Sequence, residues 1–171
     1  MSNAKRQEAL IQMSRIDARI ADLEAEIAEL TAHRERLDSS TKQGNGFVFS
    51  ARSLRNLEGI HPDLRKVAVR ALQLTEIDFV VTEGLRDSKR QRQLVNAGAS
   101  KTMASRHLTG HAIDVAALLD NRVSWDWPLY HKIADAFKQA ADELGVAIVW
   151  GGDWNTFPDG PHFELDRSVY K

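Results

Sequence analysis

The stretch Ala112-Ile113-Asp114-Val115-Ala116-Ala117-Leu118 decides the fold. It is small, apolar and partly β-branched apart from one carboxylate, which predicts a buried strand over residues 112–118. Alternation along a strand places Asp114 on one face among alanines, while Ile113 and Val115 point to the other face. A carboxylate on an otherwise apolar strand is costly to bury without a partner, and a metal ion would be such a partner.

Strands and helices are mixed on both sides of this stretch. Short apolar runs predict further strands at 79–82, 147–150 and 162–165. Apolar residues at helical spacing, together with helix-starting and helix-ending residues, predict helices at 61–75, 88–96 and 128–144. There is no regular βαβ alternation, so the pattern favours an α+β fold over a doubly wound parallel sheet.

The first 43 residues differ from the rest of the 171-residue chain, because every glycine, proline and aromatic residue follows Gln43. Apolar residues recur there in steps of three and four, at Met13, Ile16, Ile20, Leu23, Ile27, Leu30 and Leu37. Isoleucine at heptad position a and leucine at d favour a parallel two-stranded coiled coil and hence a homodimer. The alternative is a single amphipathic helix lying on its own domain.

We therefore expect two parts, an amphipathic or coiled-coil helix over 1–42 and a globular catalytic domain over 47–171. The polar, glycine-bearing stretch 39–46 predicts the linker between them. Residues 47–171 are enough for one ordinary domain.

Composition narrows the chemistry. The chain carries 23 Lys and Arg against 24 Asp and Glu, so its gross charge gives no case for binding nucleic acid or an anionic membrane. It has no cysteine, so any metal must be held by carboxylates and by the six histidines, at positions 33, 61, 107, 111, 131 and 162. No signal-peptide pattern or membrane span is seen, and we expect synthesis in the cytoplasm.

Two segments carry candidate chemistry. His107 precedes Gly110 in a segment that could fold back toward Asp114. Pro158-Asp159-Gly160-Pro161 is a strong turn that can bring Asp159 close to whatever His162 holds. A catalytic zinc has three protein ligands and an open position for water, and a nearby carboxylate can take that water's proton. His107, Asp114, His162 and Asp159 are a complete set for this chemistry, but spacing does not single them out from other His and Asp residues.

These two segments closely resemble the L-alanyl-D-glutamate peptidases of bacteriophages, in the zinc D-alanyl-D-alanine carboxypeptidase superfamily. A pattern of that family, Ser-x-His-x-x-Gly-x-Ala-x-Asp, is met at Ser105, His107, Gly110, Ala112 and Asp114. A second pattern, with a Trp-Gly-Gly-Asp-Trp run and a later Pro-His-Phe-Glu, is met over 150–164. The likeness extends from about residue 47 to 165.

The resemblance implies a small antiparallel sheet with flanking helices, and zinc ligands at His107, Asp114 and His162. It implies Asp159 as general base and hydrolysis of peptidoglycan stem peptides between L-Ala and D-Glu, causing host cell lysis. Because no signal-peptide pattern is seen, we expect release from the cytoplasm through a holin-type membrane lesion. Arg86 matches a family arginine and is expected to bind a substrate carboxylate or steady the oxyanion.

Further candidates and alternatives stay open at this point. Gln91 and Ser105 are candidates for substrate contact, and Glu164 has the strand parity to orient the ligand His162. His111 should point to the opposite strand face from Asp114. One alternative activity is D,D- or L,D-carboxypeptidase action on the same stems, and another reading is a non-catalytic cell-wall or assembly module.

Overall fold

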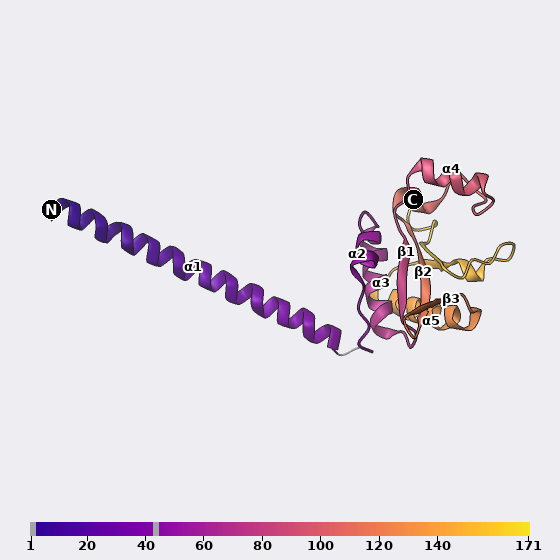
Figure 1. Cartoon of the computed structure of the whole chain (residues 1–171), viewed down its shortest axis with the longest axis horizontal. Coiled ribbons are helices and arrows are strands. Elements are labelled where there is room, and N and C mark those ends of the chain that lie inside the picture. The colour runs from indigo at the N-terminus through magenta and orange to yellow at the C-terminus, as the bar shows by residue number, and fades with distance from the viewer. Residues whose placement is uncertain (1–2, 43–44) are drawn as a thin grey trace. The chain divides into compact units, whose positions relative to one another are not determined.

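The computed structural model describes residues 3–42 and 45–171 (Figure 1). The helix α1 (Asn3–Lys42) is a compact unit by itself, and the chain from residue 45 onward is a second compact unit. The predicted linker began at residue 39, whereas α1 continues to Lys42. Residues 43 and 44 of that linker lie outside the described residues.

The helix α1 exposes the heptad residues that the sequence places in one stripe. Six of its apolar side chains, between 42 and 62 % exposed, are Met13, Ile16, Ile20, Leu23, Ile27 and Leu30. Polar residues separate them throughout. No helix among the described residues has both the length and the apolar character to cross a membrane.

The second unit is built on one antiparallel sheet, as the α+β prediction requires. Its strands are β1 (Phe79–Glu83), β2 (Ala112–Leu119), β3 (Arg122–Ser124), β4 (Ile148–Trp150) and β5 (His162–Leu165). Their order is β1-β2-β5-β4, and β3 pairs with the far end of β2. The strand predicted at 112–118 is therefore central, with partners on both edges.

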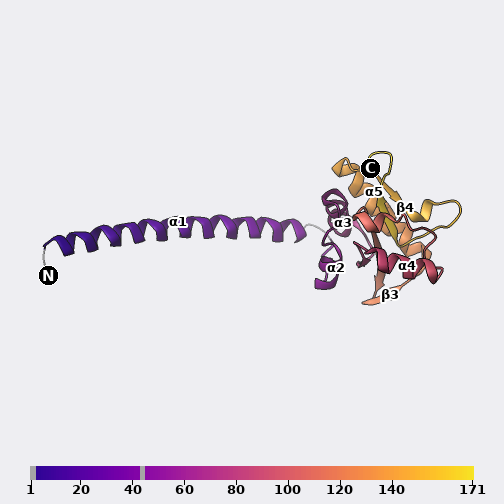
Figure 2. The same ribbon diagram turned by 90° about the horizontal axis from the view of Figure 1, so that it is seen from above.

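The same unit contains helices and 3₁₀ turns. They are α2 (Ala51–Asn56), α3 (Pro62–Leu74), α4 (Ser88–Asn96) and α5 (Trp127–Leu144), with 3₁₀ turns η1 (Arg106–Thr109) and η2 (Gly151–Asp153). The helices α3 and α5 contact each other, whereas α4 lies apart from them in both views (Figure 2). The prediction missed α2 and β3, whose six and three residues are too short for a periodic signal.

The two faces of the sheet have different roles. Ile113, Val115 and Phe163 face α3 and α5 and belong to the hydrophobic core. The rings of Phe137 and Phe163 stack with centroids 3.9 Å apart at the centre of this layer. The alternate residues of β2 and β5 point the other way, so the face opposite the core is free to carry polar side chains.

Gly110 joins η1 to β2 at a point where a side chain has no room. Its φ is +71°, and a Cβ atom there would lie 2.4 Å from the carbonyl oxygen of Gly59. The carbonyl of Gly110 also accepts a hydrogen bond from the His61 amide at 2.8 Å. Gly110 therefore fixes the approach of η1, and with it His107, to the strand that carries Asp114.

We expect Gly110→Ala to lower the free energy of unfolding by about 3 kcal/mol, since it adds a steric clash to left-handed backbone strain. Gly98→Ala is the matched control. Gly98 has a φ of +73° but open space around it, so only about 1 kcal/mol of strain is expected. Urea unfolding of both variants tests this, and equal losses would mean that the close approach at Gly110 is unimportant.

Candidate active site

Antiparallel register brings two of the predicted ligands together. Asp114 of β2 is directly opposite His162 of β5, and Ala112 is opposite Glu164. All four residues point away from the α3–α5 core. His107 joins them from η1, which lies over this face of the sheet.

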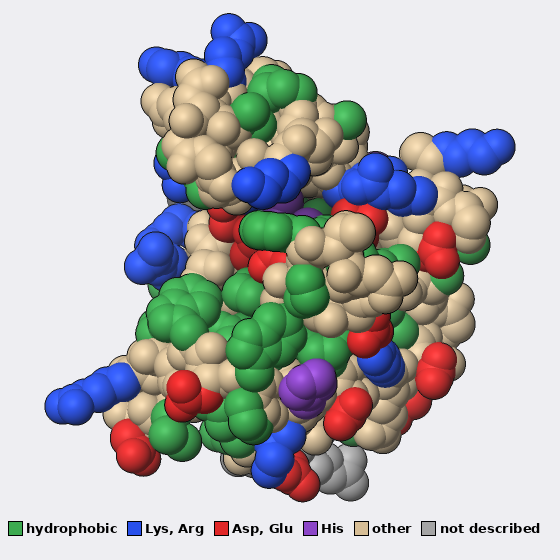
Figure 3. All heavy atoms as spheres, turned by 90° about the vertical axis from the view of Figure 1, so that its right-hand side faces the viewer, with side chains coloured by type: hydrophobic (Ala, Val, Ile, Leu, Met, Phe, Trp, Pro, Cys, Tyr) green, Lys and Arg blue, Asp and Glu red, His purple; other side chains and the backbone are tan. Residues whose placement is uncertain are grey.

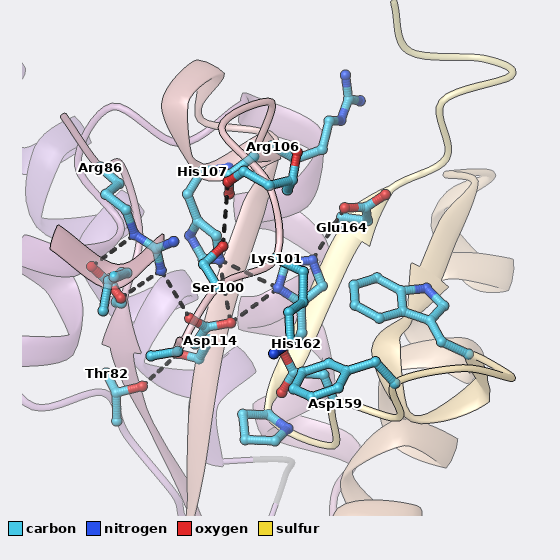
Figure 4. A pocket seen from close by; sticks show the side chains of 18 of the residues that line it. Thr82, Arg86, Ser100, Lys101, Arg106, His107, Asp114, Asp159, His162 and Glu164 are labelled. Atoms are coloured by element: carbon cyan, nitrogen blue, oxygen red, sulfur yellow. Dashed lines mark hydrogen bonds and ion pairs between the residues drawn. The ribbon is translucent and has the colours of Figure 1, made fainter. Parts of the chain in front are cut away.

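Three ligand atoms form a nearly equilateral triangle (Figure 4). His107 Nε2 lies 3.3 Å from His162 Nδ1 and 3.3 Å from Asp114 Oδ1. The third side, from His162 Nδ1 to Asp114 Oδ1, is 3.1 Å. Metal–nitrogen bonds of about 2.0–2.1 Å in a tetrahedral zinc site imply ligand–ligand separations of about 3.3 Å. These three residues could therefore hold a metal ion.

The second nitrogen of each histidine ring is also bound. His107 Nδ1 is 2.8 Å from the Gly84 carbonyl oxygen, which can only accept, so this nitrogen carries the proton. His162 Nε2 is 3.1 Å from Glu164 Oε2, and Glu164 is held in turn by Arg167. Such contacts leave the inward nitrogens as lone-pair donors and are typical of metal-binding histidines. The donor set thus fits a zinc-type ion.

The pKa values reflect a concentrated charge cluster. Burial by itself would lower the pKa of His162, but hydrogen bonds to Asp114 and Glu164 raise it to about 9. Burial opposes ionisation of Glu164, yet His162 and Arg167 lower its pKa to about 2. The pKa of Asp114 is also lowered, because hydrogen bonds from His107 and His162 outweigh its desolvation.

A bulge in β1 brings a further carboxylate to this cluster. Val81 pairs with Val115, but Glu83 pairs with Asp114, so Thr82 is an extra residue in β1. Strict alternation would have put Glu83 on the core face with Val81. Instead the Glu83 carboxylate accepts hydrogen bonds from both Nε and Nη2 of Arg86, at 3.0 and 2.6 Å.

Arg86 and Gln91 lie behind the ligand triangle. The Arg86 guanidinium donates to Gln91 at 2.7 Å and to Asp114 Oδ2 at 3.4 Å. Arg86 lines the cleft, whereas Gln91 is fully buried and donates to Ser100 and to the Thr102 carbonyl. In this arrangement Gln91 supports Arg86 and the loop after α4, and it presents no surface to a substrate.

A tight turn places Asp159 at the same centre. The Asp159 amide donates to the Gly151 carbonyl at 2.9 Å, and the His162 amide donates to the Asp159 carbonyl at 3.1 Å. A Cβ at position 151 would lie 2.6 Å from the Asp159 carbonyl oxygen, so only glycine fits there. Burial, followed by repulsion from Asp114, raises the pKa of the Asp159 carboxyl. A carboxylate with a raised pKa is suited to taking up a proton.

The ligand triangle, Asp159 and Arg86 line one cleft of about 470 Å³. Ser105 also lines it, and its hydroxyl accepts the His107 amide at 3.4 Å as the cap of η1. Figure 3 shows histidine and acidic side chains at the bottom of a groove between two lobes. His111 lies elsewhere, with Nδ1 2.8 Å from the Thr109 carbonyl. Among the side chains that the structure describes, His107, Asp114 and His162 form the one group placed to hold a metal.

The structure uses three residues to which the sequence analysis had assigned no role. Glu83 reaches the site through the bulge, Gly84 through its carbonyl, and Gly151 through the room it leaves for the Asp159 turn. No pattern in one sequence marks a bulge or a backbone carbonyl. The adjoining glycines at 151–152 signalled a close backbone approach, but not its partner.

Comparison with known proteins defines the class. The family model described as "Phage L-alanyl-D-glutamate peptidase" matches residues 45–170, the whole globular unit. The chain therefore belongs to this family of endopeptidases, as its two motifs predicted.

Individual proteins that the chain resembles carry the same activity in their names. The chain is 36 % identical over 128 residues to the L-alanyl-D-glutamate peptidase of Escherichia phage T5, covering 72 % of this chain and 93 % of that one. It is 33 % identical over 126 residues to the L-alanyl-D-glutamate peptidase of Listeria phage A118, covering 71 % of this chain and 43 % of that one. The crystal structure of the Serratia marcescens L-Ala D-Glu endopeptidase ChiX aligns with a TM-score of 0.69 at 50 % identity, covering 72 % of this chain and 93 % of that one.

The raised pKa of His162 predicts that metal binding depends on pH. The metal-free protein keeps this ring in its doubly protonated, positively charged form up to about pH 9, and the metal must displace the proton on the inward nitrogen, Nδ1. Apparent Zn²⁺ affinity should therefore rise by up to about tenfold per pH unit between pH 7 and 9. Chelator-competition titrations measure the affinity, and calorimetry in buffers of different ionisation enthalpy measures the released proton.

The raised pKa of His162 also makes the stability of the metal-free protein depend on pH, and this stability falls as the pH rises. The folded-state pKa of about 9 exceeds the ordinary value of 6.5, so this group stabilises the metal-free fold fully below pH 6.5. That contribution is lost as the pH rises through 9. The increase in Tm on adding Zn²⁺ should therefore be larger at pH 8.5 than at pH 6.5. A pH-independent affinity without proton release would show that His162 is not a ligand.

Proposed function

We propose that this protein is a zinc-dependent peptidoglycan endopeptidase that hydrolyses the L-Ala–D-Glu bond of stem peptides. The observation that carries the proposal is the ligand triangle of His107, Asp114 and His162 with Asp159 beside it in one cleft. Membership of the peptidase family supports the bond that is cut. The expected release route to the cell wall, a holin-type lesion in the host membrane, belongs to the same proposal.

When bound, zinc supplies a Lewis acid that polarises the scissile carbonyl and makes an attacking water more acidic. Asp159 accepts a proton from that water and passes it to the leaving amine of D-Glu. The raised pKa of its carboxyl assists both steps, because the proton is neither held too tightly nor released too readily. Glu164 and the Gly84 carbonyl keep the histidine rings oriented while charge develops.

Arg86 acts on this centre through Asp114. Its guanidinium contacts Asp114 Oδ2 and is held by Glu83, so it would leave the other carboxylate oxygen of Asp114 to a bound metal. Because Arg86 also lines the cleft, we keep the expectation that it meets the substrate carboxylate or the oxyanion as the reaction proceeds. Ser105, on the same wall, is a further substrate contact in this proposal.

We expect Asp159→Asn to bind Zn²⁺ normally but to lose at least about 10²-fold in kcat, because the general base is gone. His162→Ala should lose both metal and activity. Zinc content by atomic absorption and cleavage of purified murein measure the two properties. Near-normal cleavage by Asp159→Asn would show that another group is the base.

The products decide between this activity and carboxypeptidase action on the same stems. Digestion of purified muropeptides, with and without a chelator, is analysed by mass spectrometry. A chelator-sensitive product with a new amino group on D-Glu identifies the endopeptidase. Release of terminal D-Ala alone would identify a carboxypeptidase, and no cleavage by the zinc-loaded protein would favour a non-catalytic wall-binding role.

We also propose that α1 mediates a parallel homodimer. Its stripe of exposed apolar residues has the a and d spacing of a two-stranded coiled coil. Positions g and e of the two copies then face each other without a like-charged pair. The three facing pairs within the described side chains are Gln12 with Asp17, Arg19 with Glu24, and Glu26 with Thr31.

The oligomeric state tests this helix directly. The full chain should sediment as a dimer at micromolar concentration, and Ile20→Glu with Ile27→Glu should sediment as a monomer because two a positions become charged. Ala21→Glu with Ala28→Glu adds the same charge at exposed b positions and should leave the dimer intact. A monomeric wild-type chain at tens of micromolar would contradict the dimer.

A further inference from the structure

Large aromatic rings are exposed beside the cleft, and the chemistry proposed above uses none of them. Trp125 is 62 % exposed, Phe157 48 % and Trp127 44 %. Trp125 and Phe157 line the cleft itself, together with Trp154. Figure 3 shows hydrophobic side chains gathered on one side of the groove. Exposed rings in such a cluster usually mark a binding surface, because leaving them in water is unfavourable.

The position of Trp125 is fixed by its neighbours. Its ring stacks on the buried Tyr130 with an interplanar angle of 10° and centroids 6.3 Å apart. The turn that carries it is closed by a hydrogen bond from the Ser124 hydroxyl to Asp126, at 3.1 Å. Trp127 is fixed as well, with its ring edge-on to Trp150. A flat ring held in place before a ligand arrives loses little entropy on binding.

The lining of the cleft also carries positive charge. Lys101, Arg106 and Arg167 are part of it. Lys101 Nζ lies 5.5 Å from the centroid of the Phe157 ring, so a cationic and an aromatic side chain are in contact there. A ligand in this cleft therefore meets both flat aromatic rings and positive charge.

We propose that Trp125, with Phe157 and Trp154, stacks against the amino sugar of the glycan strand and so determines specificity for murein over free peptide. This rests on the proposed function. The scissile bond follows L-Ala, whose amino group is joined to muramic acid through the lactyl ether, so the sugar lies one residue, about 3.6 Å of chain, plus one lactyl group from the bond that is cut. The sugar is neutral and has C–H faces that pack on aromatic rings, whereas the stem beyond L-Ala carries carboxylates. The aromatic rings therefore take the sugar, and the cationic side chains take the stem.

The test compares two substrates that differ only in the sugar, namely the disaccharide stem peptide and the same stem peptide with an N-lactyl cap. Trp125→Ala should raise KM about tenfold more for the disaccharide peptide than for the lactyl peptide, because the lost stacking acts on the sugar alone. Trp125→Phe should recover most of the difference, since it restores a ring. Leu119→Ala is the control, because Leu119 is 52 % exposed and precedes the β2–β3 turn that leads to Trp125.

A second measurement uses the sugar without the peptide. Peptide-free glycan strands should inhibit the wild-type enzyme competitively and should inhibit Trp125→Ala at least about fivefold more weakly. An equal change in KM for both substrates, or equal inhibition of both proteins, would overturn the sugar platform. A wild-type protein that cleaves neither substrate would instead overturn the proposed function, so the two failures are distinguishable.

Discussion

The pairing of Asp114 with His162 across β2 and β5 is the constraint on which the rest of this site depends. A carboxylate on a central strand needs a partner, and antiparallel register supplies an imidazole directly opposite it. His107 completes the triangle from η1, and the close approach of Gly110 to Gly59 holds that turn against the sheet. The mutual attraction of these groups keeps Asp114 ionised despite its desolvation. An ionised carboxylate beside two imidazole rings is also a suitable set of ligands for a metal cation.

The two faces of the sheet carry the hydrophobic core and the candidate active site, respectively. One face packs against α3 and α5 and forms the core through rings such as Phe137 and Phe163. The other face carries the ligands, the outer contacts from Glu164 and Gly84, and the ion pair of Arg86 with Glu83. Because each strand residue belongs to one face only, site residues can change without disturbing the core, provided the register is kept. Cleft residues such as Lys101, Trp125 and Phe157 come from loops, where side-chain identity is freest to follow the substrate.

The sequence predicted the central strand and the major helices closely, because long apolar patterns with clear caps are strong signals. It could not predict the bulge at Thr82, which depends on how β1 pairs with a strand thirty residues away. Gln91 shows the same limit at one residue. The sequence analysis made it a candidate for substrate contact, but tertiary packing buries it against Arg86 and the loop after α4. The ligand set itself came from resemblance, since spacing left other His and Asp choices open.

By itself, the sequence determined the α+β class, the heptad stripe of α1, the absence of thiol chemistry and the family to which the two motifs belong. These properties follow from local periodicity, composition and motif order, all of which are written along the chain. Only the tertiary structure decided that three side chains from η1, β2 and β5 meet within 3.3 Å, and which ring nitrogens face inward. It alone brought aromatic and cationic side chains together around one cleft. Such arrangements depend on strand register and loop packing between distant segments, which no local pattern encodes.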